Sequence, residues 1–396
     1  MKVLIIHTTY KYRGGEDTVV AEEMKLIQAH AVTVKLLEFD NDKNTAIKLL
    51  QLPFNIHSYI KTLKKLQAYK PDVVHIHNLH FSASASVIYA IKKSKIPFVI
   101  TLHNYRLLCP SAILFHKGKP FLNSLNPKFP WKAIEQGVYK NSKIITFWVS
   151  LSMQIHQWLG TWKKCNKYIV LNEHAKKMFI QSKLQLTNKQ IAVKPNFCAA
   201  SPVAEPVASD YFLYVGRLSE EKGIQMLLKT FSLSTFKIKI AGDGPLKDEV
   251  IRYSLMYANI EFLGSLNKED VFSLLQSSSA LVFPSIWYEG MPLTIIEAFA
   301  CGTPVIASKL GAMEIMIINE YNGLHFQPEN VKDLLHKLEE WQSLNDEEKT
   351  IYRKNARHTY EQYYTPENNA EQLLAIYRSV ITEQKGLIPS IVKQPI

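Results

Sequence analysis

One segment of the chain, from Ala280 to Ser308, reads ALVFPSIWYEGMPLTIIEAFACGTPVIAS. Its first four residues form an apolar run, ended by Pro284, that is typical of a strand buried on both faces. The composition of residues 293–300 predicts a helix, which Gly302 and Pro304 end before a second short apolar run. The segment therefore predicts a β-loop-α-β unit, in which a helix begins at the carboxyl end of a parallel strand.

Such a helix start is suited to binding an anion such as a diphosphate, because free backbone amides and the helix dipole both face it. We expect the backbone around Met291, Leu293 and Thr294 to bind this anion. Two carboxylates frame the site: Glu289 lies in the loop before the helix, and Glu297 lies in its second turn. One acid can then face a sugar while the other reaches a ribose. The alternative is that both are ordinary solvated charges.

The same segment resembles the signature of the retaining glycosyltransferases of family 4, also called group 1 glycosyltransferases. The likeness consists of Glu289 and Glu297 with seven residues between them, Gly290 within that interval, and the string GTPV that begins at Gly302. The resemblance implies that Glu289 contacts hydroxyls of the donated sugar as a catalytic residue. It also implies that Glu297 holds the ribose of a nucleotide.

A second string, GRLSEEKG from residue 216 to 223, follows another predicted buried strand and also resembles the family. The resemblance implies that Arg217 and Lys222 grip the diphosphate and offset its charge as the nucleotide leaves. Two fixed cations and helix N-termini then make a divalent metal unnecessary. Gly244 lies in a tight turn at the end of the next predicted strand, and we expect Ser265 and Leu266 to contact the base.

The first strand of the chain is followed by Gly14 and Gly15, which let the backbone come close to a ligand. An ordinary turn is the alternative, and the missing G-x-G-x-x-G spacing disfavours a site for NAD. In the family, a glycine-rich first loop faces the diphosphate of the donor, so both glycines are predicted to bind the donor.

Three histidines lie on or directly after predicted strands of the N-terminal half. His103 comes directly after the strand predicted over 97–102, and the string TLHNYRLLCP resembles the family segment whose histidine contacts the donor sugar near the reacting carbon. His103 is therefore a predicted catalytic residue that orients the sugar or stabilises charge. His75 and His77 share one face of a strand, but no acid or cysteine completes a ligand set nearby, so no metal site is predicted.

Composition and charge limit the classes of protein that remain. The 396 residues suffice for two domains, and no apolar run approaches the roughly 18 residues that would cross a bilayer. The four cysteines have no metal-type spacing and indicate reduced thiols in the cytoplasm. Residues 1–200 carry 29 − 10 = +19 and residues 201–396 carry 18 − 25 = −7. The basic half favours phosphates or an anionic membrane surface, and its dispersed charge, without a recognisable reading helix, disfavours nucleic acid.

Two segments of the basic half have a mixed apolar and basic character. Residues 48–70 predict a helix that either lies on an anionic membrane or packs on the sheet as an ordinary amphipathic helix. Residues 111–162 hold four of the six tryptophans, and this insertion is expected to shape the acceptor pocket or to meet the membrane; plain core packing of the aromatic side chains is the alternative.

By resemblance, the fold is α/β with two Rossmann-like domains facing across a cleft, named GT-B. We expect an N-terminal acceptor-side domain over 1–200, a nucleotide-sugar-binding domain over 201–365 after a linker, and a helix in 366–396 that crosses back to the N-terminal domain. The implied function is retaining transfer of a hexose from a UDP- or GDP-sugar to a saccharide hydroxyl. The acceptor is expected to be lipid-linked, as in lipopolysaccharide assembly on the cytoplasmic face of the membrane, and no cofactor is expected. A sugar-nucleotide epimerase, a phosphorylase and a catalytically silent sugar-nucleotide binder are the alternatives.

Overall fold

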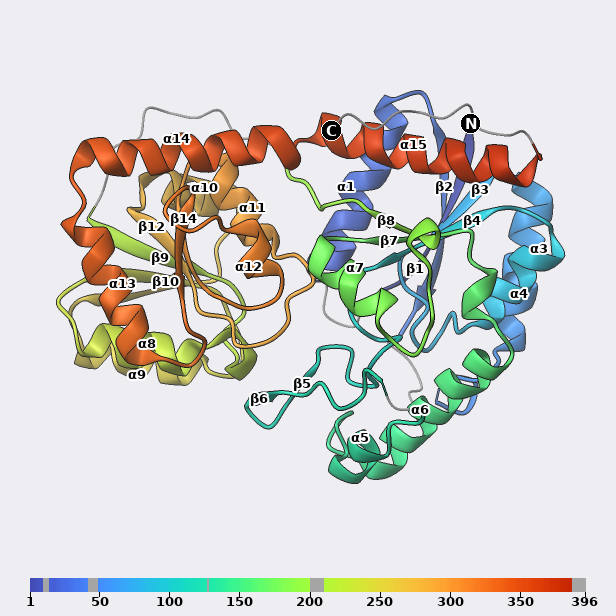
Figure 1. Ribbon diagram of the computed structural model, residues 1–396, viewed down its shortest axis with the longest axis horizontal. Helices are drawn as coiled ribbons and strands as arrows, with labels where there is room; N and C mark the ends of the chain where they lie inside the picture. The colour runs from blue at the N-terminus through green and yellow to red at the C-terminus, as the bar shows by residue number, and fades with distance from the viewer. Residues whose placement is uncertain (10–13, 42–48, 127, 200–209, 387–396) are drawn as a thin grey trace. The chain divides into compact units, whose positions relative to one another are not determined.

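The computed structural model describes residues 1–9, 14–41, 49–126, 128–199 and 210–386 (Figure 1). The chain forms two compact units. Unit 1 comprises Met1–Ala112, Leu122–Pro195 and Asn369–Ile396, and unit 2 comprises Ile113–Phe121 and Asn196–Asn368. The linker predicted over 201–209 lies outside the described residues.

Unit 1 is built on a six-stranded parallel sheet with the strand order β2-β1-β3-β4-β7-β8. Its strands are β1 (Lys2–Thr9), β2 (Thr33–Asp40), β3 (Val73–Ile76), β4 (Phe98–Leu102), β7 (Lys167–Val170) and β8 (Ile191–Val193). The order reverses between β1 and β3, so a crevice at the carboxyl ends of these two strands is the expected place for a ligand.

The helices of unit 1 lie between these strands along the chain, except α15, which follows all of them (Figure 1). They are α1 (Gly15–Ala29), α3 (Ile56–Tyr69), α4 (Ser86–Lys93), α5 (Trp131–Gln136), α6 (Lys143–Trp158), α7 (Glu173–Ile180) and α15 (Pro366–Gln384), the last from Asn369 onward. Leu373, Tyr377 and Val380 of α15 join Val3 and Ile5 of β1 in one buried cluster. Helix α15 is therefore part of the core of unit 1.

Helix α3 is shorter than the helix predicted over 48–70, whose first residue lies outside the described residues. The helix begins at Ile56, just after Pro53, and the side chain of Asn55 caps it by accepting a hydrogen bond from the amide of Ser58 at 3.2 Å. An asparagine cap satisfies an amide that has no partner within the helix, and this fixes where the helix starts. The apolar residues before Pro53 are thus separated from the helix.

Unit 2 has a second six-stranded parallel sheet, with the order β11-β10-β9-β12-β13-β14. Its strands are β9 (Tyr211–Val215), β10 (Lys237–Ala241), β11 (Ile260–Gly264), β12 (Ala280–Phe283), β13 (Val305–Ser308) and β14 (Gly323–Phe326). Its helices are α8 (Ile224–Ser232), α9 (Lys247–Met256), α10 (Lys268–Ser277), α11 (Leu293–Ala300), α12 (Ala312–Met316), α13 (Val331–Ser343) and α14 (Asp346–Tyr363). The small hairpin of β5 (Phe115–His116) and β6 (Lys119–Pro120) also belongs to this unit.

Both sheets are parallel, carry connecting helices and reverse their strand order once, which is the Rossmann-like arrangement. The prediction of two Rossmann-like α/β domains is confirmed. The segment from Ala280 to Ser308 forms β12, α11 and β13, within one residue of the predicted bounds. Pro292 has an extended conformation (φ −69°, ψ 120°) and directly precedes the helix.

Candidate active site

The candidate site of unit 2 lies where the strand order reverses, at the carboxyl ends of β9 and β12. The loop after β9 carries Arg217 and Lys222, and the loop after β12 carries Glu289. Gly223 holds these two loops together. Its φ is +73°, and a side chain at this position would come within 2.0 Å of the carbonyl oxygen of Pro284. The close approach therefore requires glycine.

Arg217 lines a pocket of about 200 Å³ together with Ser265 and Leu266, which were predicted to contact the base. The ends of three strands form this pocket: Gly216 follows β9, Gly242 and Asp243 follow β10, and Ser265 follows β11. Tyr214 is buried, and its hydroxyl donates to the carbonyl of Arg217 at 2.9 Å. The structure thus brings three of the predicted donor-binding residues together.

Packing of the backbone explains why glycine is needed at position 244. A side chain there would lie 2.4 Å from the carbonyl oxygen of Leu218, so the turn after β10 can pack on the loop after β9 only with glycine at this position. Leu218 and Asp243 also exchange a backbone hydrogen bond of 2.9 Å across the same contact. The predicted contact of Gly244 with a donor stays a prediction.

Lys222 and Glu289 form an ion pair of 2.6 Å. The same oxygen of Glu289, Oε1, also accepts hydrogen bonds from Ser285 Oγ at 2.8 Å and Trp287 Nε1 at 2.7 Å. The Lys222 ammonium lies 5.5 Å from the ring centroids of both Phe283 and Trp287, a distance at which the rings attract a cation. Glu289 is therefore a buried, fixed carboxylate that orients Lys222, and not a free acid in an open loop.

The residues around the start of α11 differ in their exposure to solvent. Met291 is buried. The backbone amide of Asn196 donates to the sulfur of Met291 at 3.2 Å, and the side-chain amide of Asn196 donates to the carbonyl of Met291 at 3.4 Å. Leu293 and Thr294 are partly exposed at the first turn. Burial raises the pKa of Glu297 in the second turn, and the nearby Lys268 ammonium opposes this shift.

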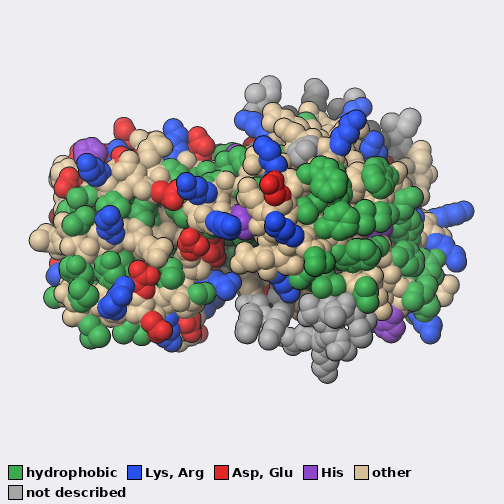
Figure 2. All heavy atoms as spheres, turned by 90° about the horizontal axis from the view of Figure 1, so that it is seen from below, with side chains coloured by type: hydrophobic (Ala, Val, Ile, Leu, Met, Phe, Trp, Pro, Cys, Tyr) green, Lys and Arg blue, Asp and Glu red, His purple; other side chains and the backbone are tan. Residues whose placement is uncertain are grey.

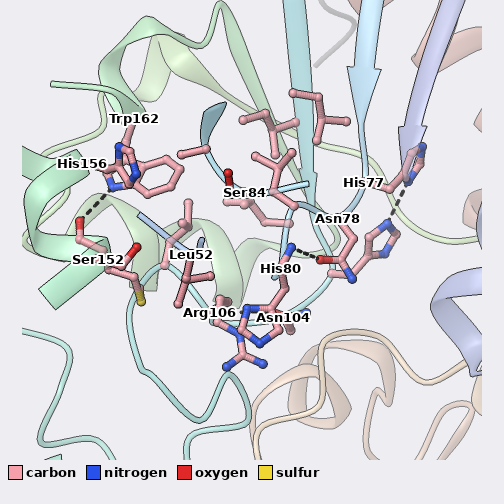
Figure 3. Close-up of a pocket in the computed structure, with 18 of the residues that line it drawn as sticks. Leu52, His77, Asn78, His80, Ser84, Asn104, Arg106, Ser152, His156 and Trp162 are labelled. Atoms are coloured by element: carbon pink, nitrogen blue, oxygen red, sulfur yellow. Dashed lines mark hydrogen bonds between the residues drawn. The ribbon is translucent and has the colours of Figure 1, made fainter. Parts of the chain in front are cut away.

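The candidate site of unit 1 contains His103, which follows β4. Its Nε2 lies 2.9 Å from Nδ1 of His77, at the end of β3, and the two rings are stacked. Both histidines line a cavity of about 110 Å³ (Figure 3). Its polar lining includes Asn78, His80, Asn104 and Arg106, and its apolar lining includes Leu52, Val149, Met153 and Trp162. Burial is the main cause that lowers the pKa of His103 well below its usual range, so His103 is neutral at pH 7.

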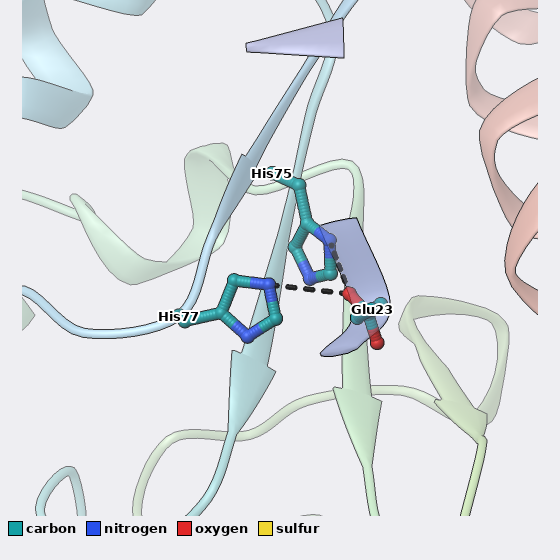
Figure 4. A group of neighbouring side chains, drawn as sticks. All are labelled: Glu23, His75 and His77. Atoms are coloured by element: carbon teal, nitrogen blue, oxygen red, sulfur yellow. Dashed lines mark ion pairs between the residues drawn. The ribbon is translucent and has the colours of Figure 1, made fainter. Parts of the chain in front are cut away.

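An acid does lie beside His75 and His77. The expectation from sequence that no acid completes a set of metal ligands with these two histidines is therefore wrong. Oε1 of Glu23, from α1, lies 3.3 Å from Nδ1 of His75 and 3.3 Å from Nε2 of His77 (Figure 4). The ammonium of Lys194 lies 2.8 Å from the other oxygen of Glu23, and both side chains are 1% exposed. Because this buried ammonium already balances the carboxylate, a divalent cation would add uncompensated charge there. The prediction of no metal site therefore stays, on this different ground.

The first loop of unit 1 is described from Gly14 onward. Gly14 has an extended backbone (φ −131°), and a side chain on it would meet nothing within 4 Å. Gly15 begins α1 and is exposed. The contact of these two glycines with a donor stays a prediction, since the local structure alone does not require glycine at position 14.

Two family models match the chain, one to each half. The model described as Glycosyltransferase Family 4 matches residues 14–198, and the model described as Glycosyl transferases group 1 matches residues 201–359. The chain belongs to the group 1 glycosyltransferases. The family resemblance predicted from the two sequence strings is confirmed, and the protein is a glycosyltransferase of group 1 type with the GT-B fold.

Individual glycosyltransferases support this assignment. The chain is 26% identical over 362 residues to an uncharacterized glycosyltransferase of Methanocaldococcus jannaschii, covering 88% of this chain and 90% of that protein. It is 29% identical over 182 residues to O-antigen chain mannosyltransferase C of Escherichia coli, covering 45% of this chain and 48% of that one. The solved structure of Anabaena HepE in complex with UDP-glucose has a TM-score of 0.65 at 16% identity, covering 96% of this chain and all of that one.

Two buried residues of this group 1 glycosyltransferase were not found from its sequence, Glu23 and Lys194. One signal for Glu23 was available. Helix α1 buries Val19, Val20, Glu23 and Ile27, so the acid occupies a position three or four residues from apolar neighbours on the core face. An acid on such a face requires a buried partner. Nothing in the sequence pairs it with Lys194, which is 171 residues away.

Proposed function

We propose that this glycosyltransferase moves a hexose from a UDP- or GDP-sugar to a hydroxyl of a lipid-linked saccharide, with retention at the anomeric carbon and without a divalent metal. The observation that carries the proposal is the pairing of Lys222 with the fixed carboxylate of Glu289 in unit 2, at the same switch point where Arg217 lines a pocket. Cations at this point suit the diphosphate of a nucleotide sugar.

The Lys222 ammonium has three N–H donors, and Glu289 takes one of them. The other donors remain for oxygens of a diphosphate, while the carboxylate and two aromatic rings hold the ammonium in position. As the bond between the sugar and the diphosphate breaks, negative charge grows on the leaving oxygen, and a cation already in place stabilises that charge without rearrangement. Arg217, which lines the neighbouring pocket, adds a second positive charge, and this is the reason to propose a reaction that needs no metal.

The proposed transfer occurs on one face of the sugar. The departing phosphate oxygen takes the proton of the acceptor hydroxyl, the new bond forms on the side from which the nucleotide leaves, and the anomeric configuration is kept. Glu289 then acts by orienting Lys222 and hydroxyls of the sugar, and no covalent intermediate with the protein is required. Family membership supports this scheme, as do the three hydrogen-bond donors that fix Glu289 Oε1.

The names of relatives support the proposed classes of donor and acceptor. HepE was solved with UDP-glucose, and the Escherichia coli relative is named as an O-antigen chain mannosyltransferase. These names support a nucleotide-activated hexose as donor and a growing cell-surface saccharide as acceptor for the present chain.

Incubating the protein with a panel of UDP- and GDP-hexoses tests the donor and the reaction. We expect one donor to release its nucleoside diphosphate, faster when a lipid-linked saccharide is added, and the proton NMR coupling at the new anomeric centre to match that of the donor. Opposite coupling would overturn retention. Release from no donor in the panel, with no thermal stabilisation by any of them, would overturn the proposed donor class; a bound ligand at 100 times its Kd adds about 2.7 kcal/mol.

We also propose that unit 1 sits on the cytoplasmic face of an anionic membrane. Figure 2 shows hydrophobic side chains gathered on one face of this unit, with lysine and arginine side chains near their margin. The exposed members of this apolar patch are Leu50, Phe54 and Ile56 before and at the start of α3, Trp131 on α5, and Ile144, Phe147, Trp158 and Leu159 on and after α6.

Hydrogen bonds join the segment before α3 to α6. Trp148 Nε1 donates to the carbonyl of Leu49, and a ring nitrogen of His156 lies 2.7 Å from the carbonyl oxygen of Pro53. The patch is thus one surface built from two distant parts of the sequence. No helix among the described residues is long and apolar enough to cross a bilayer.

The charge around the patch suits anionic lipid. Residues 128–164 hold six lysines and a single acid, Glu135. Aromatic and aliphatic side chains beside lysines are typical of surfaces that lie in the membrane interface, where each lysine near an anionic surface contributes about 1 kcal/mol.

Vesicle flotation tests this surface. We expect binding to vesicles with anionic lipid, weaker binding in high salt because charges are screened, and a loss of roughly tenfold or more for Ile144→Glu. Leu255→Glu is the matched control, since Leu255 is equally exposed, at 83% against 82% for Ile144, but lies in unit 2. Binding that ignores both lipid charge and the Ile144 substitution would count against the proposal.

A further inference from the structure

A buried polar chain runs from Lys194 to the predicted catalytic residue His103, entirely within unit 1. Lys194 Nζ contacts Glu23 Oε2 at 2.8 Å, Glu23 Oε1 lies 3.3 Å from His77 Nε2, and His77 Nδ1 lies 2.9 Å from His103 Nε2. Figure 4 shows Glu23 facing both His77 and His75, and Figure 3 shows His77 beside the cavity. The function of the protein as argued above does not use Glu23 or His77.

The charge of Glu23 sets the direction of the hydrogen bonds. Burial by itself raises the pKa of this carboxyl, but the Lys194 ammonium and the hydrogen bond from His77 outweigh burial and hold the pKa well below its ordinary value. Glu23 is therefore an acceptor only. Neither Glu23 Oε1 nor His77 Nε2 makes a hydrogen bond within the usual geometric limits to a described residue, and the two atoms lie 3.3 Å apart, so the carboxylate attracts a proton on His77 Nε2.

The next link follows from the chemistry of imidazole. A neutral histidine that carries its proton on Nε2 has a lone pair on Nδ1. In this tautomer His77 Nδ1 accepts from His103, which places the proton of His103 on its Nε2. The remaining nitrogen of His103, Nδ1, makes no hydrogen bond with a described residue, and the His103 side chain is partly exposed where it lines the cavity.

We infer that Glu23 and His77 are positioning residues that fix His103 in its Nε2–H tautomer, so that His103 presents the lone pair of Nδ1 to a substrate hydroxyl. His103 then accepts a hydrogen bond and does not donate one, which narrows its predicted role to orienting a hydroxyl of the substrate. This inference deepens the proposed function and rests on it only for the identity of that substrate.

His75 is also close to Glu23 but does not connect it to His103. It is as close to Glu23 as His77 is, at 3.3 Å, but its two nitrogens are taken by Tyr377 and Thr101 at 2.7 Å each. No hydrogen bond joins His75 to His103 in the described part of the chain. His75 therefore belongs to the packing of α15 on the sheet, and it offers a matched control on the same strand.

Nitrogen NMR of the full chain, labelled with ¹⁵N at histidine and measured without substrate, tests the tautomer directly. The signals of His103 are assigned by their loss in His103→Gln. We expect the wild-type protein to carry the His103 proton on Nε2, and His77→Phe to remove this preference. His75→Phe, which removes a buried histidine of the same strand, is expected to leave the His103 tautomer unchanged.

Turnover supplies the second readout. We expect His77→Phe to lower kcat by about 10- to 100-fold, the usual effect of losing a group that orients a functional histidine. His77→Asn, whose side-chain oxygen can still accept from His103, is expected to recover part of that loss. A wild-type His103 protonated on Nδ1, or a tautomer unaffected by His77→Phe, would overturn the inference even if the substrate is not a nucleotide sugar. Absence of any transferase activity with an Nε2–H tautomer would overturn the proposed function alone.

Discussion

Replacing Lys194 by methionine should destabilise unit 1 strongly. The ammonium of Lys194 contacts Glu23 at 2.8 Å and Asn369 of α15 at 3.2 Å, and the lysine is 1% exposed. Methionine fills a similar volume but leaves the Glu23 carboxylate buried without a cation. Removing one partner of a buried ion pair costs about 3–5 kcal/mol, because the remaining charge is uncompensated.

The effect should depend on pH in a defined direction. In the wild-type protein the pKa of Glu23 is depressed below its ordinary value of 4.5. The ionised carboxylate therefore contributes its full share to the free energy of unfolding above pH 4.5, and this share is lost as the pH falls below that value toward the folded pKa. In Lys194→Met, burial without the ammonium raises that pKa. The carboxyl can then take up a proton as the pH falls, so the deficit relative to wild type should be largest near pH 7 and should shrink toward pH 5.

Urea unfolding followed by tryptophan fluorescence measures this deficit, because four of the six tryptophans lie in unit 1. With a slope of about 2–3 kcal/mol per molar, the midpoint should fall by roughly 1–2 M. The double variant Glu23→Gln with Lys194→Met should regain much of the loss. Lys237→Met removes an ion pair of similar length, 2.7 Å, between Lys237 and Asp210. These two side chains are 61% and 68% exposed, so the substitution should barely change the urea midpoint. Equal midpoints for Lys194→Met and Lys237→Met would refute the argument.

Three further predictions concern the active site and the histidines. Lys222→Ala and Glu289→Gln should each lower turnover by roughly 10²–10³-fold, and together by little more, because the two groups hold one another. Lys239→Ala, which breaks a partly exposed ion pair with Glu261, is the control. Near-normal turnover in both site variants would reject their assignment. Burial lowers the pKa of His75 and His103 well below 6.5, so both histidines stay neutral in the folded protein. Unit 1 should therefore lose stability as the pH falls from 6.5 to 5, by at most about 2 kcal/mol per histidine at 1.36 kcal/mol per pH unit. Urea midpoints that do not change over this range would contradict this. Transfer should persist in excess EDTA, and inhibition that Mn²⁺ reverses would argue for a metal.

Local sequence was sufficient for most strands and for α11. The bounds of β12, α11 and β13 follow from an apolar run and from the proline and glycine residues around it, because these residues act on their own stretch of backbone. The start of α3 was misjudged, since the helix pattern before Pro53 looked continuous while the cap at Asn55 fixed the true start. The resemblance of two strings to a known family supplied the donor-side residues, of which Arg217, Ser265 and Leu266 meet in one pocket.

Tertiary structure alone decided how the charged groups are paired. Lys222 and Glu289 are 67 positions apart, and Lys194 and Glu23 are 171 apart, so no periodic pattern connects them. Their contacts depend on which strand ends become neighbours when the sheets form, and the strand order is a property of the whole domain. The sequence by itself determined most of the elements and the family, and it predicted which residues bind an anion. Only the folded sheet determined that Glu289 is bound to a lysine and that His103 is linked to a buried acid, because burial makes each of those charges require a partner.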